Sequence, residues 1–287
     1  DGPYAYIGSP VFVHNANGQF TGDITLEDSV IRSLNIPALK TMDALLSGDG
    51  IGYERVTNYL TSLGFDPQTA QNVNSAYSIG GGLFTATPLQ VAGAHAAMIN
   101  NGQYIRPHTI TRIEIEGRDP IYPNFEPVQV ISPEAAYLTA TVMKAAVDAP
   151  FGSGTAASMN QRPYPVYSKT GTSDHGDEFE AYGIKEGTTK DAWHAASTSE
   201  YTHVVWNGFK QFINEDGTPN FIADPWPNAQ QVAHQSNLLI DNAATFHEPV
   251  ALERPAGVVN IRHVLAVYPY VAPVEGMSEE FIANGLI

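Results

Sequence analysis

The run Lys169-Thr170-Gly171-Thr172 combines residue types that suit a strand binding a carboxylate and an acyl group. A lysine ammonium supplies positive charge toward a substrate carboxylate, and threonine hydroxyls can fix the same group. Glycine has no Cβ, so an acyl group can lie against the backbone at that position. The alternative is a surface strand with a solvated lysine, and the run alone does not decide between the two.

Two Ser-x-Asn tripeptides could complete such a site, Ser33-Leu34-Asn35 and Ser158-Met159-Asn160. About one such match is expected by chance in a chain of this size. The first stands at a helix break, because Pro37 lacks an N–H and should end one helix near Ser33 and start another. Both polar side chains can point into a cleft there. The second lies in a loop close ahead of Lys169, so we expect Ser33 and Asn35 to belong to the site.

The apolar spacing predicts a largely helical first two-thirds of the chain, followed by a β-rich part. Thr25, Thr87 and Ser132 have the side chains of helix N-caps, and Gly48 and Gly102 are helix stops. The predicted helices cover residues 25–33, 37–46, 53–63, 88–100, 133–147 and 228–245. The predicted strands cover residues 166–172, 191–198, 202–209 and 257–266. The second and third strands are close enough to form an antiparallel hairpin, which favours an α+β architecture.

Several segments together resemble the transpeptidase domain of class A, bifunctional penicillin-binding proteins, in the order in which that family has them. The resemblance is firm over roughly residues 22–208 and looser elsewhere. The segments are DSVIRSLNIPAL at 28–39, GGGLFTATPLQVA at 80–92 with NNG at 100–102, GSGTA at 152–156, SKTGTS at 168–173, DAWH at 191–194 and YTHVVWNG at 201–208.

The resemblance implies an α/β fold of the α+β type, like that of penicillin-binding transpeptidases and β-lactamases. A five-stranded antiparallel sheet would be flanked by helices, with an all-helical lobe beside it and the active site between them. Ser33 would relay protons in acyl transfer, and Asn35 would contact the amide of the donor peptide. Lys169 would orient the substrate and neutralise charge.

The resemblance also implies that Thr170 and Thr172 bind the terminal carboxylate, with Gly171 beside them and the N–H of Thr172 in the oxyanion hole. The implied function is a peptidoglycan D,D-transpeptidase that cross-links stem peptides through a serine acyl-enzyme and binds β-lactam antibiotics. A D,D-carboxypeptidase or β-lactamase of the same fold, and a non-catalytic scaffold, remain alternatives.

The nucleophile of this family requires a serine three residues before a lysine, one helical turn away, so that the amine can take the hydroxyl proton. No Ser-x-x-Lys exists in the chain. The pair Thr141 and Lys144 comes nearest, but it follows the Ser-x-Asn and has the pattern of helix surface residues. We therefore expect that an upstream fragment or domain carries Ser-x-x-Lys, accompanied or not by a glycosyltransferase domain, and that this polypeptide alone is inactive. A pseudoenzyme that lost its serine is the rival explanation.

Composition excludes several other classes. The 30 acidic and 14 basic residues give a formal net charge of -16, which argues against nucleic-acid binding. There are no cysteines and no HExxH spacing among the nine histidines, so we expect no metal and no cofactor. The carboxylates of Asp174, Asp177, Glu178 and Glu180 could bind calcium, although their loose spacing favours a solvated acidic loop.

The chain has no apolar stretch long enough to span a membrane. The family resemblance therefore implies a position on the extracytoplasmic face of the bacterial membrane, with the anchor in a segment outside this chain. We expect residues 1–250 to form the transpeptidase domain and residues 251–287 to form a C-terminal extension.

Overall fold

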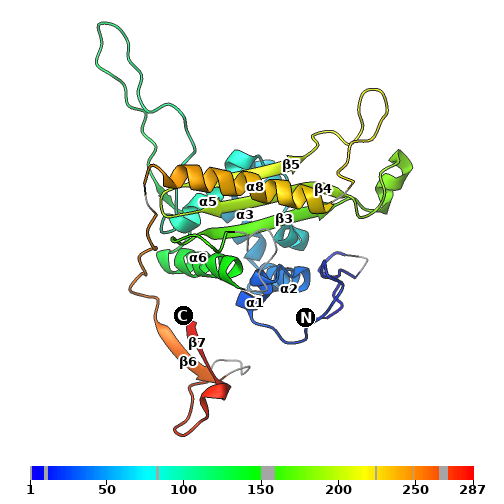
Figure 1. The fold of residues 1–287 in the computed structure, drawn as a ribbon, viewed down its shortest axis with the longest axis vertical. Coiled ribbons are helices and arrows are strands. Elements are labelled where there is room, and N and C mark those ends of the chain that lie inside the picture. The colour runs from blue at the N-terminus through cyan, green and yellow to red at the C-terminus, as the bar shows by residue number, and fades with distance from the viewer. Residues whose placement is uncertain are drawn as a thin grey trace.

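The computed structural model describes residues 2–9, 12–81, 84–149, 159–223, 225–247, 249–264 and 271–287. The centre of the fold is an antiparallel sheet of three strands in the order β3-β4-β5 (Figure 1). The strands are β3 (Tyr167–Asp174), β4 (Thr189–Ser197) and β5 (Thr202–Gly208). β3 is thus an edge strand, and it carries the run that begins at Lys169. The three predicted strands, including the hairpin of β4 and β5, are confirmed.

Helices cover both faces of this sheet. α8 (Pro225–Ala244) packs on β4 and β5 from one side (Figure 1). On the other side, α5 (Pro88–Ile99) packs on β4 and β5, while α6 (Pro133–Asp148) packs on β3. Apolar residues of α5 and α6 form a core with a β3 residue between them: Ala97, Met98, Ala140, Met143 and Tyr167. This second face is the one that meets the helical lobe.

The helical lobe consists of short helices from the first part of the chain. They are α1 (Leu26–Ile31), α2 (Asn35–Ser47), α3 (Gly52–Ser62), α4 (Pro67–Gln71) and the 3-10 helix η1 (Ser75–Ile79). Its own core joins α2, α3 and η1 through Leu46, Val56, Val73 and Tyr77. α1 packs against α6, so the lobe lies beside β3 rather than beside β5. The lobe therefore adjoins the edge of the sheet that carries the predicted site.

The predicted N-caps are confirmed. The hydroxyl of Thr25 accepts from the backbone N–H of Asp28, and that of Ser132 accepts from Ala135. Thr87 forms a capping box with Gln90, in which each side chain bonds the backbone of the other residue. The start of α2 differs from prediction, because the helix begins at Asn35 and not at Pro37. Pro37 fits inside the first turn, where a missing N–H costs nothing.

The expected five-stranded sheet is not confirmed, since the central sheet of the described residues has three strands. The predicted last strand forms as β6 (Asn260–Val264), but it pairs with β7 (Ile282–Leu286) in a separate hairpin (Figure 1). A strand pairs with the partner that lies alongside it, and the returning chain after the 3-10 helix η3 (Glu279–Phe281) supplies that partner for β6. The mixed, antiparallel fold class itself is as predicted.

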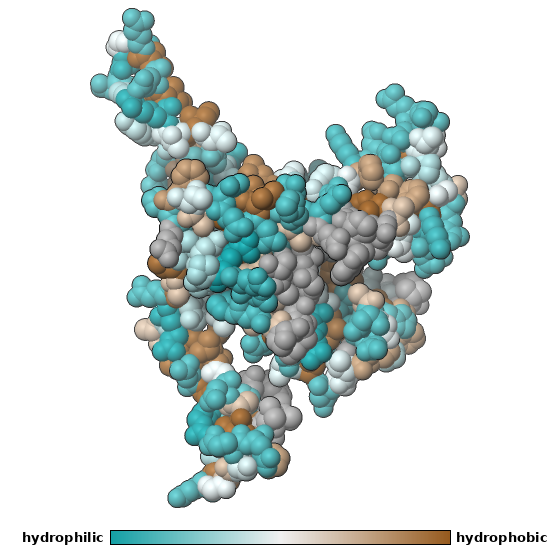
Figure 2. Space-filling model, viewed as in Figure 1, coloured by the Kyte–Doolittle hydropathy of each residue, from teal (hydrophilic) through white to brown (hydrophobic). Residues whose placement is uncertain are grey.

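A long arm extends from the body between the short strands β1 (Gln103–Tyr104) and β2 (Val128–Gln129), which pair with each other (Figure 1). A β-bridge joins Ile113 to Ile121 within the arm. Apolar side chains are exposed along it, as the brown surface among teal shows (Figure 2). In the described part of the chain, no helix has the length and apolar character needed to cross a bilayer.

Candidate active site

The site joins the helical lobe to the edge strand. The ammonium of Lys169 on β3 donates to the hydroxyl oxygen of Ser33, with 2.7 Å between Nζ and Oγ. It also donates to the carbonyl of Thr170 at 2.8 Å. The structure thus brings together the two motifs that the sequence singled out. The first Ser-x-Asn tripeptide is in direct contact with the lysine through Ser33.

Ser33 has an unusual backbone conformation, with φ of +55°. It follows α1 in a Schellman turn, in which Ser33 donates its N–H to Val30 and Leu34 donates to the carbonyl of Ser29. Glycine is the usual residue there, because the left-handed conformation costs other residues about 1–2 kcal/mol. The presence of a serine here despite this conformational cost is consistent with a functional role for its hydroxyl.

Burial lowers the pKa of the Lys169 ammonium from 10.5 to about 8. At neutral pH most of the lysine still carries its charge, but the proton is far easier to remove than from a solvated lysine. Such a group can attract a carboxylate and can also exchange a proton through the Ser33 hydroxyl. The pair therefore has the properties of an acyl-transfer site that binds an anionic substrate.

Gly171 leaves room along the same strand. A Cβ added to Gly171 would lie 3.5 Å from the Cβ of Trp193, an ordinary contact distance. No atom of the described residues therefore requires glycine here, and among these residues the space beside the backbone is open to a ligand. β3 pairs with β4 alone in the described sheet, so its outer edge presents backbone groups that no other strand bonds.

The two threonines lie on the opposite face of β3 from the lysine. Successive side chains of a strand alternate between faces, so Lys169 and Gly171 share the lobe face while Thr170 and Thr172 do not. A ligand lying along the edge of β3 can reach both faces. Their contact with a substrate carboxylate stays a prediction.

Asn35 is the first residue of α2, two positions after Ser33. Its Nδ2 donates to the backbone carbonyl of His14 at 3.0 Å. This bond to the N-terminal segment was not predicted. It fixes the side chain next to the corner that carries Ser33.

The other predicted candidates lie outside the described residues or make contacts elsewhere. Ser158 and the GSGTA segment at 152–156 lie outside the described residues, while Met159 is buried in the core. Thr141 donates its hydroxyl to the carbonyl of Tyr137, and Lys144 forms an ion pair with Asp148. The Thr141–Lys144 pair, which comes nearest to a Ser-x-x-Lys motif, therefore makes its contacts within α6.

Three histidines lie in or near the core, as packed histidines rather than metal ligands. His194 bonds Ser168, His95 bonds Ser197 at 2.8 Å, and His203 bonds Ser236. Burial lowers the pKa of His194 to about 3 and the pKa values of His95 and His203 to about 4, so all three are neutral at pH 7. Among the described residues, no group of three or more potential ligands could hold a metal ion.

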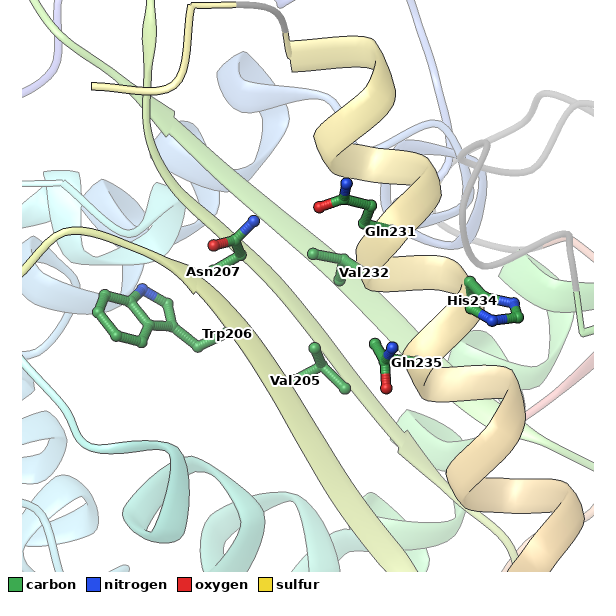
Figure 3. A pocket seen from close by; sticks show the side chains of 7 residues that line it. All are labelled: Val205, Trp206, Asn207, Gln231, Val232, His234 and Gln235. Atoms are coloured by element: carbon green, nitrogen blue, oxygen red, sulfur yellow. The ribbon is translucent and has the colours of Figure 1, made fainter. Parts of the chain in front are cut away.

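A groove lies elsewhere, between β5 and α8 (Figure 3). Its volume is about 550 Å³. It contains none of the predicted site residues: its lining consists of Val205, Trp206, Asn207, Gln231, Val232, His234 and Gln235. α8 packs on the face of the sheet away from the lobe, so this groove is separate from the Ser33–Lys169 pair.

Two of the three tryptophans lie on neighbouring strands. Trp193 of β4 and Trp206 of β5 are register partners, with ring centroids 6.0 Å apart. The indole N–H of Trp206 donates to Asp191 at 2.8 Å, and Ser173 at the end of β3 donates to the same carboxylate at 3.0 Å. This network ties the three strands together on the face of Lys169.

Two kinds of relative share this chain's sequence or fold. Penicillin-binding protein 1A/1B of Bacillus subtilis is 30% identical over 254 residues, 87% of this chain and 26% of that protein. Penicillin-binding protein 1A of Streptococcus oralis is 28% identical over 215 residues, 73% of this chain and 32% of that protein. The chain therefore spans about a quarter to a third of the length of these relatives.

Solved structures share the fold at lower identity. Penicillin-binding protein 1A from Haemophilus influenzae aligns with a TM-score of 0.67 at 18% identity, over 98% of this chain and 43% of that one. PonA1 from Mycobacterium tuberculosis, in complex with penicillin V, aligns with a TM-score of 0.59 at 18% identity, over 88% and 64%. A family model described as the penicillin-binding protein transpeptidase domain matches residues 3–205, well over half of the chain. The chain belongs to the penicillin-binding protein transpeptidase domain family.

Proposed function

We propose that this chain forms most of the active-site cleft of a peptidoglycan D,D-transpeptidase. The contact between Lys169 and Ser33 carries the proposal, because it joins the lobe and the edge strand at one polar point. The serine nucleophile would come from a Ser-x-x-Lys segment that is not among these 287 residues. This chain alone would then bind no β-lactam covalently.

Acyl transfer needs a nucleophile, a proton carrier and a group that holds the substrate anion. The supplied serine would attack the donor peptide carbonyl, forming an acyl-enzyme and releasing the leaving amine. The hydroxyl of Ser33 accepts a hydrogen bond from Lys169, so it would pass the proton to that amine. An acceptor amine would then attack the acyl-enzyme and restore the serine.

Substrate binding would use the free edge of β3. The ammonium of Lys169 would attract the terminal carboxylate, and the hydroxyls of Thr170 and Thr172 would hold it from the other face of the strand. The N–H of Thr172 would stabilise the oxyanion. The acyl group would pass beside Gly171, and the amide of Asn35 would contact the donor peptide.

The comparisons support this function at the level of the family. The names of the relatives are those of penicillin-binding proteins, and PonA1 has been solved with penicillin V. We extend peptidoglycan stem peptides, β-lactam binding and an extracytoplasmic, membrane-anchored location to the complete protein. The boundary after residue 250 and an accompanying glycosyltransferase domain belong to the same proposal.

Labelling with a fluorescent penicillin tests the proposal. The complete protein should form a stable covalent adduct, seen as a mass increase, and the 287-residue chain should not. Gly171→Ala should fold, because its methyl has room, yet should label far more slowly by filling ligand space. Failure of the complete protein to label would refute the function. Rapid loss of the adduct would indicate a β-lactamase or carboxypeptidase instead.

A further inference from the structure

The N-terminus of α2 is capped from a distant part of the chain. Its own N-cap residue, Leu34, has no side chain that can accept a hydrogen bond. The carboxamide oxygen of Asn15 takes that place by accepting from the backbone N–H of Ile36 at 3.2 Å. Asn15 is only 3% exposed, and its Nδ2 donates to the carbonyl of Gln19 at 2.8 Å. Both ends of this buried side chain are therefore held.

The neighbouring residue acts on Asn35. A backbone carbonyl can only accept, so the carbonyl of His14 must face the Nδ2 of Asn35, and the two atoms lie 3.0 Å apart. This bond settles which way the carboxamide of Asn35 is turned. The acceptor oxygen is left on the other side of the group. Thus two successive residues fix the first turn of α2 and the orientation of its polar side chain.

The segment that carries these residues is itself anchored. We use the term N-terminal strap for the described residues 4–9 and 12–19. At its far end, the hydroxyl of Tyr4 and the N–H of Ile7 both bond the buried carboxylate of Asp43, two turns along α2. This contact raises the pKa of Tyr4 to about 12, through the hydrogen bond first, then burial and the negative charge of Asp43. The strap is thus fastened to α2 at both ends.

The corner between α1 and α2 needs this support. Ser33 stands in a left-handed conformation that disfavours residues other than glycine, so the corner does not hold its geometry by local preference. The Schellman turn fixes it from α1, and Lys169 fixes the hydroxyl from β3. On the α2 side, the cap that Asn15 supplies fixes the first turn of the helix and so the third side of the corner.

We propose that Asn15 is a positioning residue of the transpeptidase site, which holds the Ser33-Leu34-Asn35 corner in its reactive geometry by capping α2. The proposal rests on the proposed function, because it concerns the same site. Asn15 touches no substrate and acts through Ile36 and Asn35. Loss of the cap should slow acylation by about 5- to 30-fold, the factor that corresponds to the usual energetic value of an N-cap.

The test measures the second-order rate of acylation of the complete protein by a fluorescent penicillin. Asn15→Ala should reduce the rate by that factor, whereas Asn15→Asp, which keeps the accepting oxygen but loses the donation to Gln19, should lose less of the rate than Asn15→Ala. Asn17→Ala is the matched control, because Asn17 is an exposed strap residue whose side chain accepts from the backbone N–H of Gln19 and does not bond α2 among the described residues. It should acylate at the wild-type rate.

A double-mutant cycle separates positioning from a general loss of stability. In an Asn35→Ala background the orientation of that side chain no longer matters, so Asn15→Ala should cost clearly less than in wild type. Equal costs in both backgrounds, or a wild-type rate for Asn15→Ala, would overturn the proposal. If Asn15→Ala does not fold, Asn15→Asp is used in the same cycle, and an equal loss of rate in the wild-type and Asn35→Ala backgrounds contradicts the positioning role. A wild-type protein that is never acylated would instead refute the proposed function.

Discussion

Replacing Lys169 by methionine should separate the stability of this fold from its function. Burial lowers the pKa of the ammonium from 10.5 to about 8, a difference of about 2.5, and each pKa unit corresponds to about 1.4 kcal/mol. Holding the charged form in the folded protein therefore costs about 3 kcal/mol at pH 7. Methionine has similar length without the charge, but it gives up the hydrogen bonds to Ser33 and Thr170. Since such bonds contribute about 1 kcal/mol each, a net gain of about 1 kcal/mol is expected.

The pH dependence of this difference is the sharper measurement. Between pH 8 and pH 10.5 the unfolded chain holds the lysine proton more tightly than the folded chain, so the wild type gains stability as pH rises. The stability advantage of Lys169→Met should therefore shrink by about 2 kcal/mol from pH 7 to pH 10. Urea unfolding followed by tryptophan fluorescence at the two pH values gives both free energies of unfolding.

A matched control is Lys210→Met, because Lys210 is exposed and loses little hydration on folding. It gives the effect on stability of removing an exposed ammonium at each of the two pH values. The same change at Lys169 should abolish penicillin labelling of the complete protein, as expected where function keeps a destabilising charge. If the Lys169→Met difference were the same at pH 7 and pH 10, the argument from burial would be wrong.

Three further predictions concern stability. Thr87→Ala should lower the free energy of unfolding by about 1 kcal/mol by removing the capping box with Gln90, while Thr87→Ser should preserve it; urea midpoints measure both. Arg162→Lys should lower the melting temperature, because lysine lacks the planar guanidinium that forms the bidentate hydrogen bond to Asp241; an unchanged melting temperature would contradict this. His194 is neutral when folded, with its pKa lowered to about 3 by burial, but takes a proton when unfolded below about pH 6.5. The contribution of His194 to stability should therefore fall by about 1.4 kcal/mol per pH unit below pH 6, so total stability should fall less steeply in His194→Gln than in wild type.

Much of the fold could be predicted because its determinants are local. Thr87 and Ser132 indicate helix starts, because their hydroxyls accept from backbone N–H groups three residues later. The helix break at Ser33 and the strand through Lys169 could also be predicted from the sequence, since a proline and a β-rich run are local signals. Their contact followed from the resemblance to a known family and not from the pattern itself.

The remainder depends on contacts between distant segments. α4 and η1 each have five residues, too few for a helical periodicity to appear. Asn15 lies in the stretch HNANGQ, whose composition indicates a turn, and nothing there points to a helix that begins at Asn35. The expected count of five strands is not confirmed for a similar reason, because strand pairing is decided between segments and a strand pattern does not specify its partner.

The contact between Ser33 and Lys169 also bears on how the chain folds. The two residues are 136 positions apart, so bringing them together closes a long loop of chain. Loop closure costs entropy before the contact returns any energy, and contacts of this kind slow folding. We expect the lobe and the β3-β4-β5 meander to form first and the pair to meet last. In that case a molecule of the complete protein could bind a β-lactam covalently only after it has finished folding. Covalent labelling would then count the fully folded molecules.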